Sequence, residues 1–81
     1  MRDLVLYTTL GCHLCDQAKD VIWPCLEVFS YRLVEVDIAE DATLVERYGV
    51  RIPVVYRSDL DEELGWPFDA QSLSEFLQRP V

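Results

Sequence analysis

The sequence has few basic residues, one histidine and no long apolar run. Seven Lys and Arg residues stand against 15 Asp and Glu, which gives a formal net charge of −8, and the basic residues do not cluster. A surface for nucleic acid or anionic lipid needs a basic patch. The apolar run that begins at Leu4 is too short for a signal peptide or a membrane span. We therefore expect no nucleic-acid or membrane partner, and we expect a cytoplasmic monomer.

Cysteine is also scarce, and its three copies are an odd number. An odd count argues against the disulfide framework of a secreted protein and favours one working pair with one cysteine left over. The pair is Cys12 and Cys15, spaced CxxC. The leftover is Cys25, which we expect to be a core thiol.

Metal binding is an alternative use of the same segment, because His13 and Asp16 accompany the two thiols. A closed structural zinc site usually draws a second ligand pair from elsewhere in the chain. The sequence contains neither a second CxxC nor another histidine. We therefore expect no metal unless two chains share the ion.

The length of 81 residues suits one domain and is too short for two. Hydrophobic residues make up 51% of the chain, and glycine and proline are few, as in a compact α/β core. We expect a single domain over residues 1–81.

The first half of the chain alternates between strand and helix patterns. Residues 4–8 form an apolar, β-prone run, and residues 12–22 have helical spacing. Pro24 should end or kink this helix. Residues 31–38 alternate between apolar and acidic side chains, which predicts an edge strand with its acidic side in water.

A short helix follows that strand. Asp41 is placed to cap it, Ala42, Val45 and Tyr48 should face inward, and Gly49 should end it in a left-handed conformation.

Two further strands and a helix complete the pattern. Pro53 opens a strand over residues 54–56, residues 62–65 return antiparallel, and Asp69 caps a last helix. The predicted order is βαβαββα, an α/β fold with a four-stranded mixed sheet flanked by helices. Its first strand–helix–strand unit should be parallel and right-handed.

The two cysteines of the pair are placed for different roles. Unpaired N–H groups at a helix start stabilise a thiolate, so Cys12 should be the nucleophile. Cys15, one turn deeper, should attack a mixed disulfide at Cys12 and release the reduced substrate. His13 as imidazolium would stabilise the Cys12 thiolate, whereas Asp16 would disfavour it.

The element order, the CxxC at the first helix and Ile52–Pro53 before the third strand together resemble the thioredoxin fold. The small size resembles its glutaredoxin branch. Residues 11–18 and 47–54, with the late Phe68–Asp69, are similar to a group of short bacterial glutaredoxin-like proteins. The resemblance implies that Pro53 is cis and faces the CxxC, and that Ile52 pairs its backbone with the substrate's.

Several positions depart from the glutaredoxin pattern. Glutaredoxins usually carry a proline and an aromatic between the cysteines, a lysine shortly before them, Thr-Val before the cis-proline and Gly-Gly ahead of the last helix. These places hold His13–Leu14, Thr8–Thr9, Arg51–Ile52 and Gly65–Trp66. The missing lysine and glycines argue against glutathione as the substrate.

Other residues could compensate for these departures. Arg51 could replace the missing lysine, and the N–H groups after Asp69 could receive a carboxylate. Trp66 and Phe68 are either an aromatic wall beside the cysteines or core residues under a loop.

We therefore expect a dithiol/disulfide oxidoreductase that acts on a disulfide-containing protein or a small thiol or disulfide. No cofactor is implied, although glutathione is a candidate co-substrate. A non-catalytic thioredoxin-fold binding module or a metal-binding protein is the alternative. An arsenate-reductase-like reaction would need an arginine-rich anion pocket, for which Arg51 is the one obvious candidate.

Overall fold

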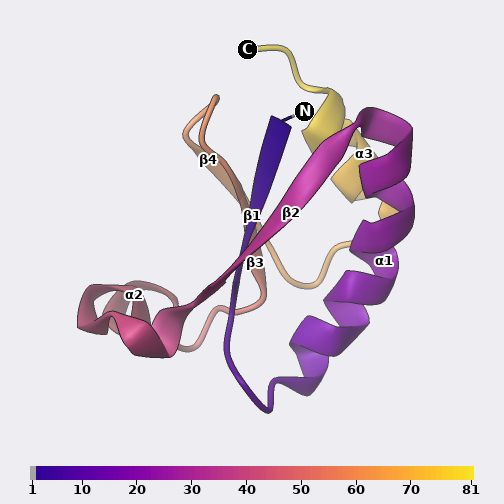
Figure 1. Cartoon of the computed structure of the whole chain (residues 1–81). Helices are drawn as coiled ribbons and strands as arrows, with labels where there is room; N and C mark the ends of the chain where they lie inside the picture. The colour runs from indigo at the N-terminus through magenta and orange to yellow at the C-terminus, as the bar shows by residue number, and fades with distance from the viewer. Residues whose placement is uncertain (1) are drawn as a thin grey trace.

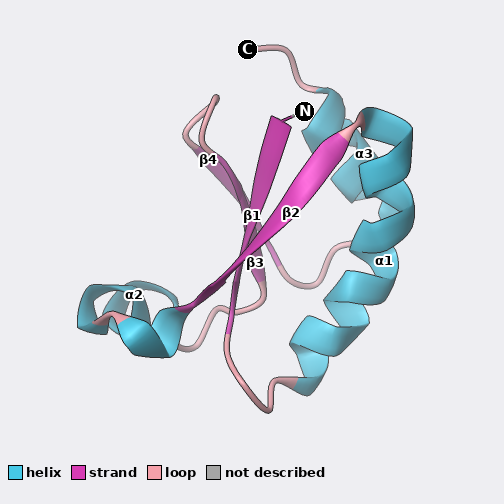
Figure 2. Cartoon of the chain, viewed as in Figure 1, coloured by secondary structure: helices cyan, strands magenta, loops and turns pink. Residues whose placement is uncertain are grey.

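The computed structural model describes residues 2–81. Its elements follow the predicted order βαβαββα, with one added 3₁₀ turn (Figures 1 and 2). They are β1 (Arg2–Thr8), α1 (His13–Phe29), β2 (Tyr31–Asp37), η1 (Ile38–Glu40), α2 (Ala42–Tyr48), β3 (Val54–Arg57), β4 (Glu62–Gly65) and α3 (Ala70–Gln78).

The four strands form one mixed sheet in the order β2-β1-β3-β4. Strands β1 and β2 are parallel, with Leu4 opposite Leu33, while β3 is antiparallel to both β1 and β4. The sequence prediction of β2 as an edge strand is confirmed. The mixed α/β architecture is that of the thioredoxin fold.

The larger hydrophobic core lies between the sheet and the helices α1 and α3, which stand side by side in Figure 1. Alternate residues of the central strands face it, and apolar positions of both helices close it. Its fully buried members are Leu4, Leu6, Ala18, Ile22, Val55, Leu73 and Leu77.

A smaller cluster joins the sheet to α2. Ile38, Tyr48 and Val54 are buried in it, and Tyr7 and Leu44 pack against it. The Tyr7 and Tyr48 rings stack with their centroids 4.3 Å apart. The predicted helix is therefore present, but Leu44 and Tyr48 face inward, whereas Ala42 and Val45 are exposed.

The expected end of the helix at Pro24 is wrong, because α1 continues to Phe29. Pro24 is exposed, and it removes one backbone donor while the residues around it, Ile22, Cys25 and Leu26, stay buried against the core. Tertiary packing on both sides of the proline outweighs the lost hydrogen bond.

The expected left-handed cap at Gly49 is also wrong. Its φ of −53° is right-handed, and its N–H bonds to the Val45 carbonyl at 2.8 Å. A Cβ at Gly49 would lie 2.5 Å from that carbonyl oxygen. The position therefore favours glycine through close backbone approach rather than through positive φ.

Glu35 of β2 is exposed, as the alternation suggested, whereas Asp37 is half-buried. Strand β2 ends at Asp37, and Ile38 is buried in η1. Glu35 reaches Lys19 on α1, with their charged atoms 2.5 Å apart. These side chains therefore line the space between β2 and α1.

Candidate redox site

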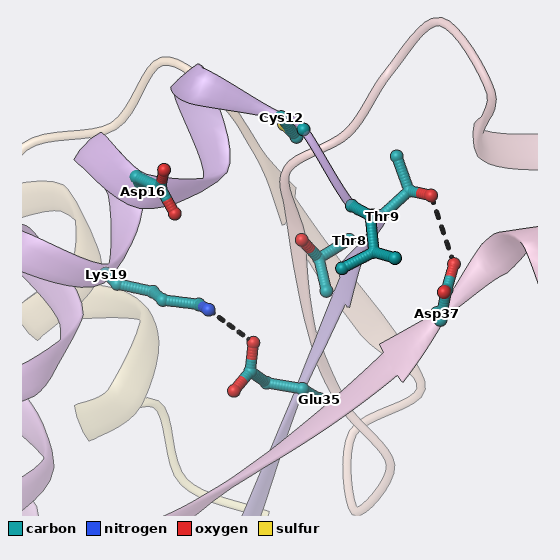
Figure 3. Close-up of a pocket in the computed structure, with 9 residues that line it drawn as sticks. Thr8, Thr9, Cys12, Asp16, Lys19, Glu35 and Asp37 are labelled. Carbon is teal, nitrogen blue, oxygen red and sulfur yellow. Dashed lines mark hydrogen bonds and ion pairs between the residues drawn. The ribbon is translucent and has the colours of Figure 1, made fainter.

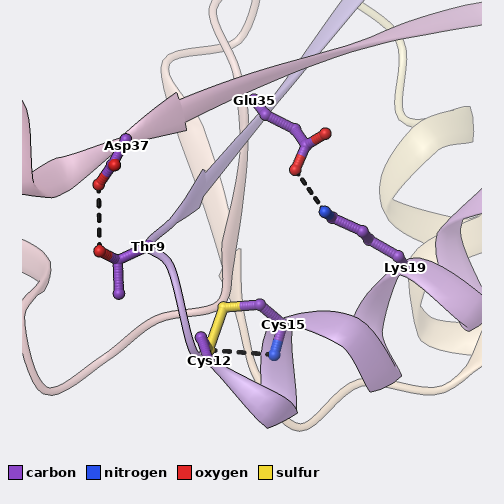
Figure 4. Close-up of a disulfide and its surroundings, with 6 residues drawn as sticks. All are labelled: Thr9, Cys12, Cys15, Lys19, Glu35 and Asp37. Atoms are coloured by element: carbon purple, nitrogen blue, oxygen red, sulfur yellow. Dashed lines mark hydrogen bonds and ion pairs between the residues drawn. A yellow bond between two sulfur atoms is a disulfide. The ribbon is translucent and has the colours of Figure 1, made fainter.

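The CxxC segment lies where β1 turns into α1. Cys12 is the N-cap residue of α1, and its Sγ accepts a hydrogen bond from the Cys15 N–H at 3.1 Å (Figure 4). A disulfide joins the two residues, whose Cα atoms are 5.2 Å apart. Gly11, with φ of 78°, forms the turn before them.

The two sulfur positions differ in exposure. Cys12 is partly exposed at the helix start, whereas Cys15 is 2% exposed and packed one turn further on. The orphan N–H groups and the positive end of the helix dipole favour an anion at Cys12. An incoming group can therefore reach Cys12 while Cys15 remains shielded.

The residues between and beside the cysteines face outward. His13 is exposed at the first position of α1, and Leu14 is 46% exposed. Leu10, in the preceding turn, is 92% exposed. The approach to Cys12 therefore has an apolar rim on either side of the turn.

A pocket of about 360 Å³ opens beside Cys12, between the end of β1, the first turns of α1 and the end of β2 (Figure 3). Sequence reasoning missed it, because it did not bring the acidic residues of β2 together with α1. The signal was available in the topology, since parallel strands bring their carboxyl ends to one edge. Its lining residues are Thr8, Thr9, Leu10, Gly11, Cys12, Asp16, Lys19, Glu35 and Asp37.

Pro53, which precedes the third strand, is buried, and its peptide bond with Ile52 is cis. The Pro53 carbonyl accepts a hydrogen bond from the Trp66 N–H at 3.0 Å, which ties this loop to β4. The Ile52 N–H bonds to the Tyr48 carbonyl at 3.1 Å, so it is already occupied within the chain. A second cis bond, Trp66–Pro67, was not anticipated.

Arg51 lies in a polar cluster with Glu63 and Tyr48. Its guanidinium pairs with Glu63 of β4 and stands 5.3 Å from the centre of the Tyr48 ring. Tyr48 donates a hydrogen bond to Glu63 at 3.0 Å. Burial and that hydrogen bond raise the pKa of Tyr48 to about 12. Burial opposes ionisation of Glu63, but the bonds from Arg51 and Tyr48 outweigh it and lower its pKa.

Of the aromatic pair before α3, Phe68 is buried in the core and Trp66 is half-buried against it. Trp66 and Phe68 meet edge to face with ring centroids 5.1 Å apart, and both pack in the α1/α3 cluster. Asp69 caps α3 and forms a capping box with Ser72. Hydrogen bonds from the Ser72 N–H and hydroxyl lower the pKa of Asp69.

The predicted site residues thus fall into two groups. Cys12, His13 and Cys15 share one turn, whereas Arg51 and Asp69 are engaged elsewhere. Over residues 2–81, no hydrogen bond or ion pair joins Arg51 or Asp69 to the cysteine segment.

Two general features of the described residues bear on function. Within residues 2–81, no three His, Cys, Asp or Glu side chains come together as a metal site. None of the helices in the same range has the length and apolar character needed to cross a membrane.

Comparison with known proteins agrees with the fold. The model of the family described as Glutaredoxin-like domain (DUF836) matches residues 3–78, and the chain therefore belongs to this glutaredoxin-like family.

Solved structures with the same architecture include a structural genomics target, XcR50 from X. campestris. Its X-ray structure is 39% identical over 95% of this chain and 99% of that one, with a TM-score of 0.79. Its solution structure matches 99% of this chain and 97% of that one with a TM-score of 0.78. Protein Ne2328 from Nitrosomonas europaea is 27% identical over 95% of this chain and 92% of its own, with a TM-score of 0.81.

Proposed function

We propose that the protein is a dithiol/disulfide oxidoreductase. The Cys12 thiolate attacks a substrate disulfide, the substrate S–S bond breaks, and one substrate arm leaves as a thiolate. Cys15, as thiolate, then attacks the Cys12 sulfur of the mixed disulfide and releases the second arm as a thiolate. The substrate gains two electrons and the Cys12–Cys15 pair loses two, becoming a disulfide.

The observation that carries this proposal is the Cys15 N–H donated to the Cys12 Sγ at the start of α1. Such a bond favours the thiolate over the thiol, because the donor interacts most strongly with the charged form. Burial of Cys15 supports its assignment as the resolving thiol, since it is shielded from substrate but adjacent to Cys12. His13, when protonated, would add positive charge beside the same sulfur.

The substrate side of the reaction extends this proposal. The partner is a disulfide-containing protein or a small disulfide, and we assign substrate contact to Ile52 and Pro53, which precede β3, and to Trp66, which follows β4 and donates its N–H to the Pro53 carbonyl. Glutathione is proposed as a co-substrate and not as the substrate. Arg51, which could have replaced the lysine missing from the glutaredoxin pattern, is paired with Glu63. A cytoplasmic location and a monomeric state complete the proposal, since reduced thiols persist in that compartment.

Cysteine variants test this function with a matched control inside the chain. Reduced protein is mixed with the neutral bis-hydroxyethyl disulfide, and mass spectrometry follows the products. We expect Cys15→Ser to accumulate a mixed disulfide at Cys12 and Cys12→Ser to lose the reaction. Cys25→Ala should react at the wild-type rate, because Cys25 is buried in the core, 3.8 Å from the Ser74 hydroxyl.

Equal rates for Cys12→Ser and wild type would contradict the proposal. A reduced protein whose Cys12 resists alkylation near neutral pH would favour a binding module instead. Stoichiometric metal that copurifies and leaves on chelation would favour a metal-binding protein.

A further inference from the structure

The pocket beside Cys12 carries an excess of negative charge. Its charged lining residues are Asp16, Lys19, Glu35 and Asp37, so three carboxylates accompany one ammonium group. The ion pair between Lys19 and Glu35 compensates the ammonium charge. The lining is left with two formal negative charges, those of Asp16 and Asp37.

Asp37 is held in a fixed position at the mouth of this pocket. Its Oδ1 accepts hydrogen bonds from the Thr9 hydroxyl at 3.1 Å and from the Ala39 N–H at 2.9 Å. Figure 3 shows the Thr9 bond and the Lys19–Glu35 pair on the two sides of the pocket. A carboxylate fixed before a ligand arrives can attract a cation without first losing its own conformational freedom.

The size of the pocket limits what it can hold. At about 360 Å³ it lies near the lower end of the range for small-ligand sites, roughly 300 to 1,000 Å³. It suits a single side chain or a small thiol. Because Cys12 is part of its wall, a group inside it lies next to the attacked disulfide.

We propose that this pocket selects disulfides whose arm beside the sulfur carries a positive charge. The arm is an ammonium group of a small aminothiol or a basic side chain next to a cysteine in a peptide. The inference rests on the proposed disulfide chemistry of Cys12 and adds its substrate class. Thiolate attack brings negative charge to the substrate sulfurs, and the carboxylates of Asp16 and Asp37 repel that charge. A positive charge on the substrate arm offsets this repulsion.

Three small disulfides that differ in charge provide the test. Rate constants for reduced protein are measured with cystamine, which is cationic, with bis-hydroxyethyl disulfide, which is neutral, and with dithiodipropionate, which is anionic. Each rate is divided by that of dithiothreitol with the same disulfide, because leaving-group pKa also changes the rate. We expect cystamine to be favoured over the neutral disulfide by about three- to tenfold and the anionic one to be slowest.

Variants separate the pocket from the net charge of the whole molecule. Asp16→Asn/Asp37→Asn should reduce the cystamine preference to below about twofold, because it removes the two uncompensated charges. Glu27→Gln/Glu46→Gln removes two exposed carboxylates outside the pocket lining and should keep the preference. The single variant Asp16→Asn, at an exposed position, should show part of the effect without disturbing the Asp37 hydrogen bonds.

The outcomes distinguish this inference from the function beneath it. Equal normalised rates for all three disulfides, or an equal loss of preference in the control double variant, would overturn the charge selection and leave the oxidoreductase function standing. No reaction with any disulfide would remove that function and the inference with it. Peptide disulfides with Lys or Glu beside the cysteine then identify the source of the arm. A preference for Lys that Asp16→Asn weakens indicates a peptide substrate, and its absence restricts the site to small aminothiols.

Discussion

Replacing Arg57 with methionine should destabilise the fold far more than an exposed arginine would. The Arg57 side chain is fully buried on β3, and its Nε and Nη2 contact the Asp59 carboxylate at 3.1 and 2.7 Å. Its Nη1 donates to the carbonyl oxygens of Phe76 and Arg79 at 2.9 and 2.7 Å. The guanidinium therefore satisfies carbonyls at the end of α3 that have no partner within the helix.

The magnitude follows from these contacts. Hydrogen bonds from a charged donor contribute about 1.5 to 3 kcal/mol each, and the variant leaves two carbonyls and one carboxylate without their donor. Removing the buried cation recovers part of its desolvation cost, and methionine fills most of the volume, so no large cavity term is added. We expect Arg57→Met to lower the free energy of unfolding by about 3 kcal/mol, within the range for breaking a buried pair.

Urea unfolding of the disulfide form measures this change. With a slope of about 1.5 kcal/mol per molar urea for a chain of this size, the midpoint should fall by about 2 M. Arg32→Met is the matched control, since Arg32 pairs with Asp3 at 2.8 Å but its side chain is 66% exposed. That control should change stability by no more than about 0.5 kcal/mol. Equal losses for the two variants would refute the reasoning, and Arg57→Lys provides an intermediate if the methionine variant does not fold.

Three further predictions test other parts of the structure. Because the pKa of Tyr48 is raised from 10.0 to about 12, its contribution to stability is complete below pH 10 and is lost as the pH rises toward 12. Unfolding at alkaline pH with tyrosinate absorbance should show this loss, and Tyr48→Phe should lack it. The pKa of Asp69 is lowered, so its contribution is present above the ordinary carboxyl range and is lost as the pH falls through the lowered pKa. Asp69→Asn should keep the cap but remove that acid dependence, whereas an acid dependence unchanged in Asp69→Asn would contradict the assignment. Gly49→Ala should cost roughly 1 to 3 kcal/mol in thermal unfolding, because its Cβ would meet the Val45 carbonyl. Gly65→Ala, where a Cβ meets nothing within 4 Å, is the control, and equal melting temperatures would show that the backbone relaxes freely.

The order of the helices and strands could be predicted because each has a recognisable local sequence pattern. Residues 4–8 form an apolar, β-prone run, residues 12–22 have helical spacing, and Asp41 and Asp69 cap their helices as their residue types suggest. The α/β fold and the placement of the CxxC at a helix start follow from these local signals.

Long-range contacts are the part that the sequence does not reveal. Arg57 occupies a strand position, and its helix-end partners lie 19 and 22 residues away. Lys19 and Glu35 likewise meet only because β2 folds back beside α1. The prediction that the helix ends at Pro24 was wrong because it also depended on long-range contacts. Burial of neighbouring side chains against the core decides whether the helix continues.

The proposed redox chemistry and the predicted anchoring of α3 by Arg57 lie at opposite ends of one sheet. Thr8 and Asp37 are register partners at the carboxyl ends of β1 and β2, next to the Cys12 pocket. Arg57 lies at the other end, where Asp59 also stands 3.9 Å from Arg2 at the start of β1. Residues so separated, with no shared partner, should act independently. Reduced Arg57→Met, at a urea concentration where it remains folded, should therefore alkylate at Cys12 within about twofold of the wild-type rate. A folded variant with a much slower Cys12 would show instead that the anchoring of α3 reaches the cysteine turn through the core that α1 and α3 share.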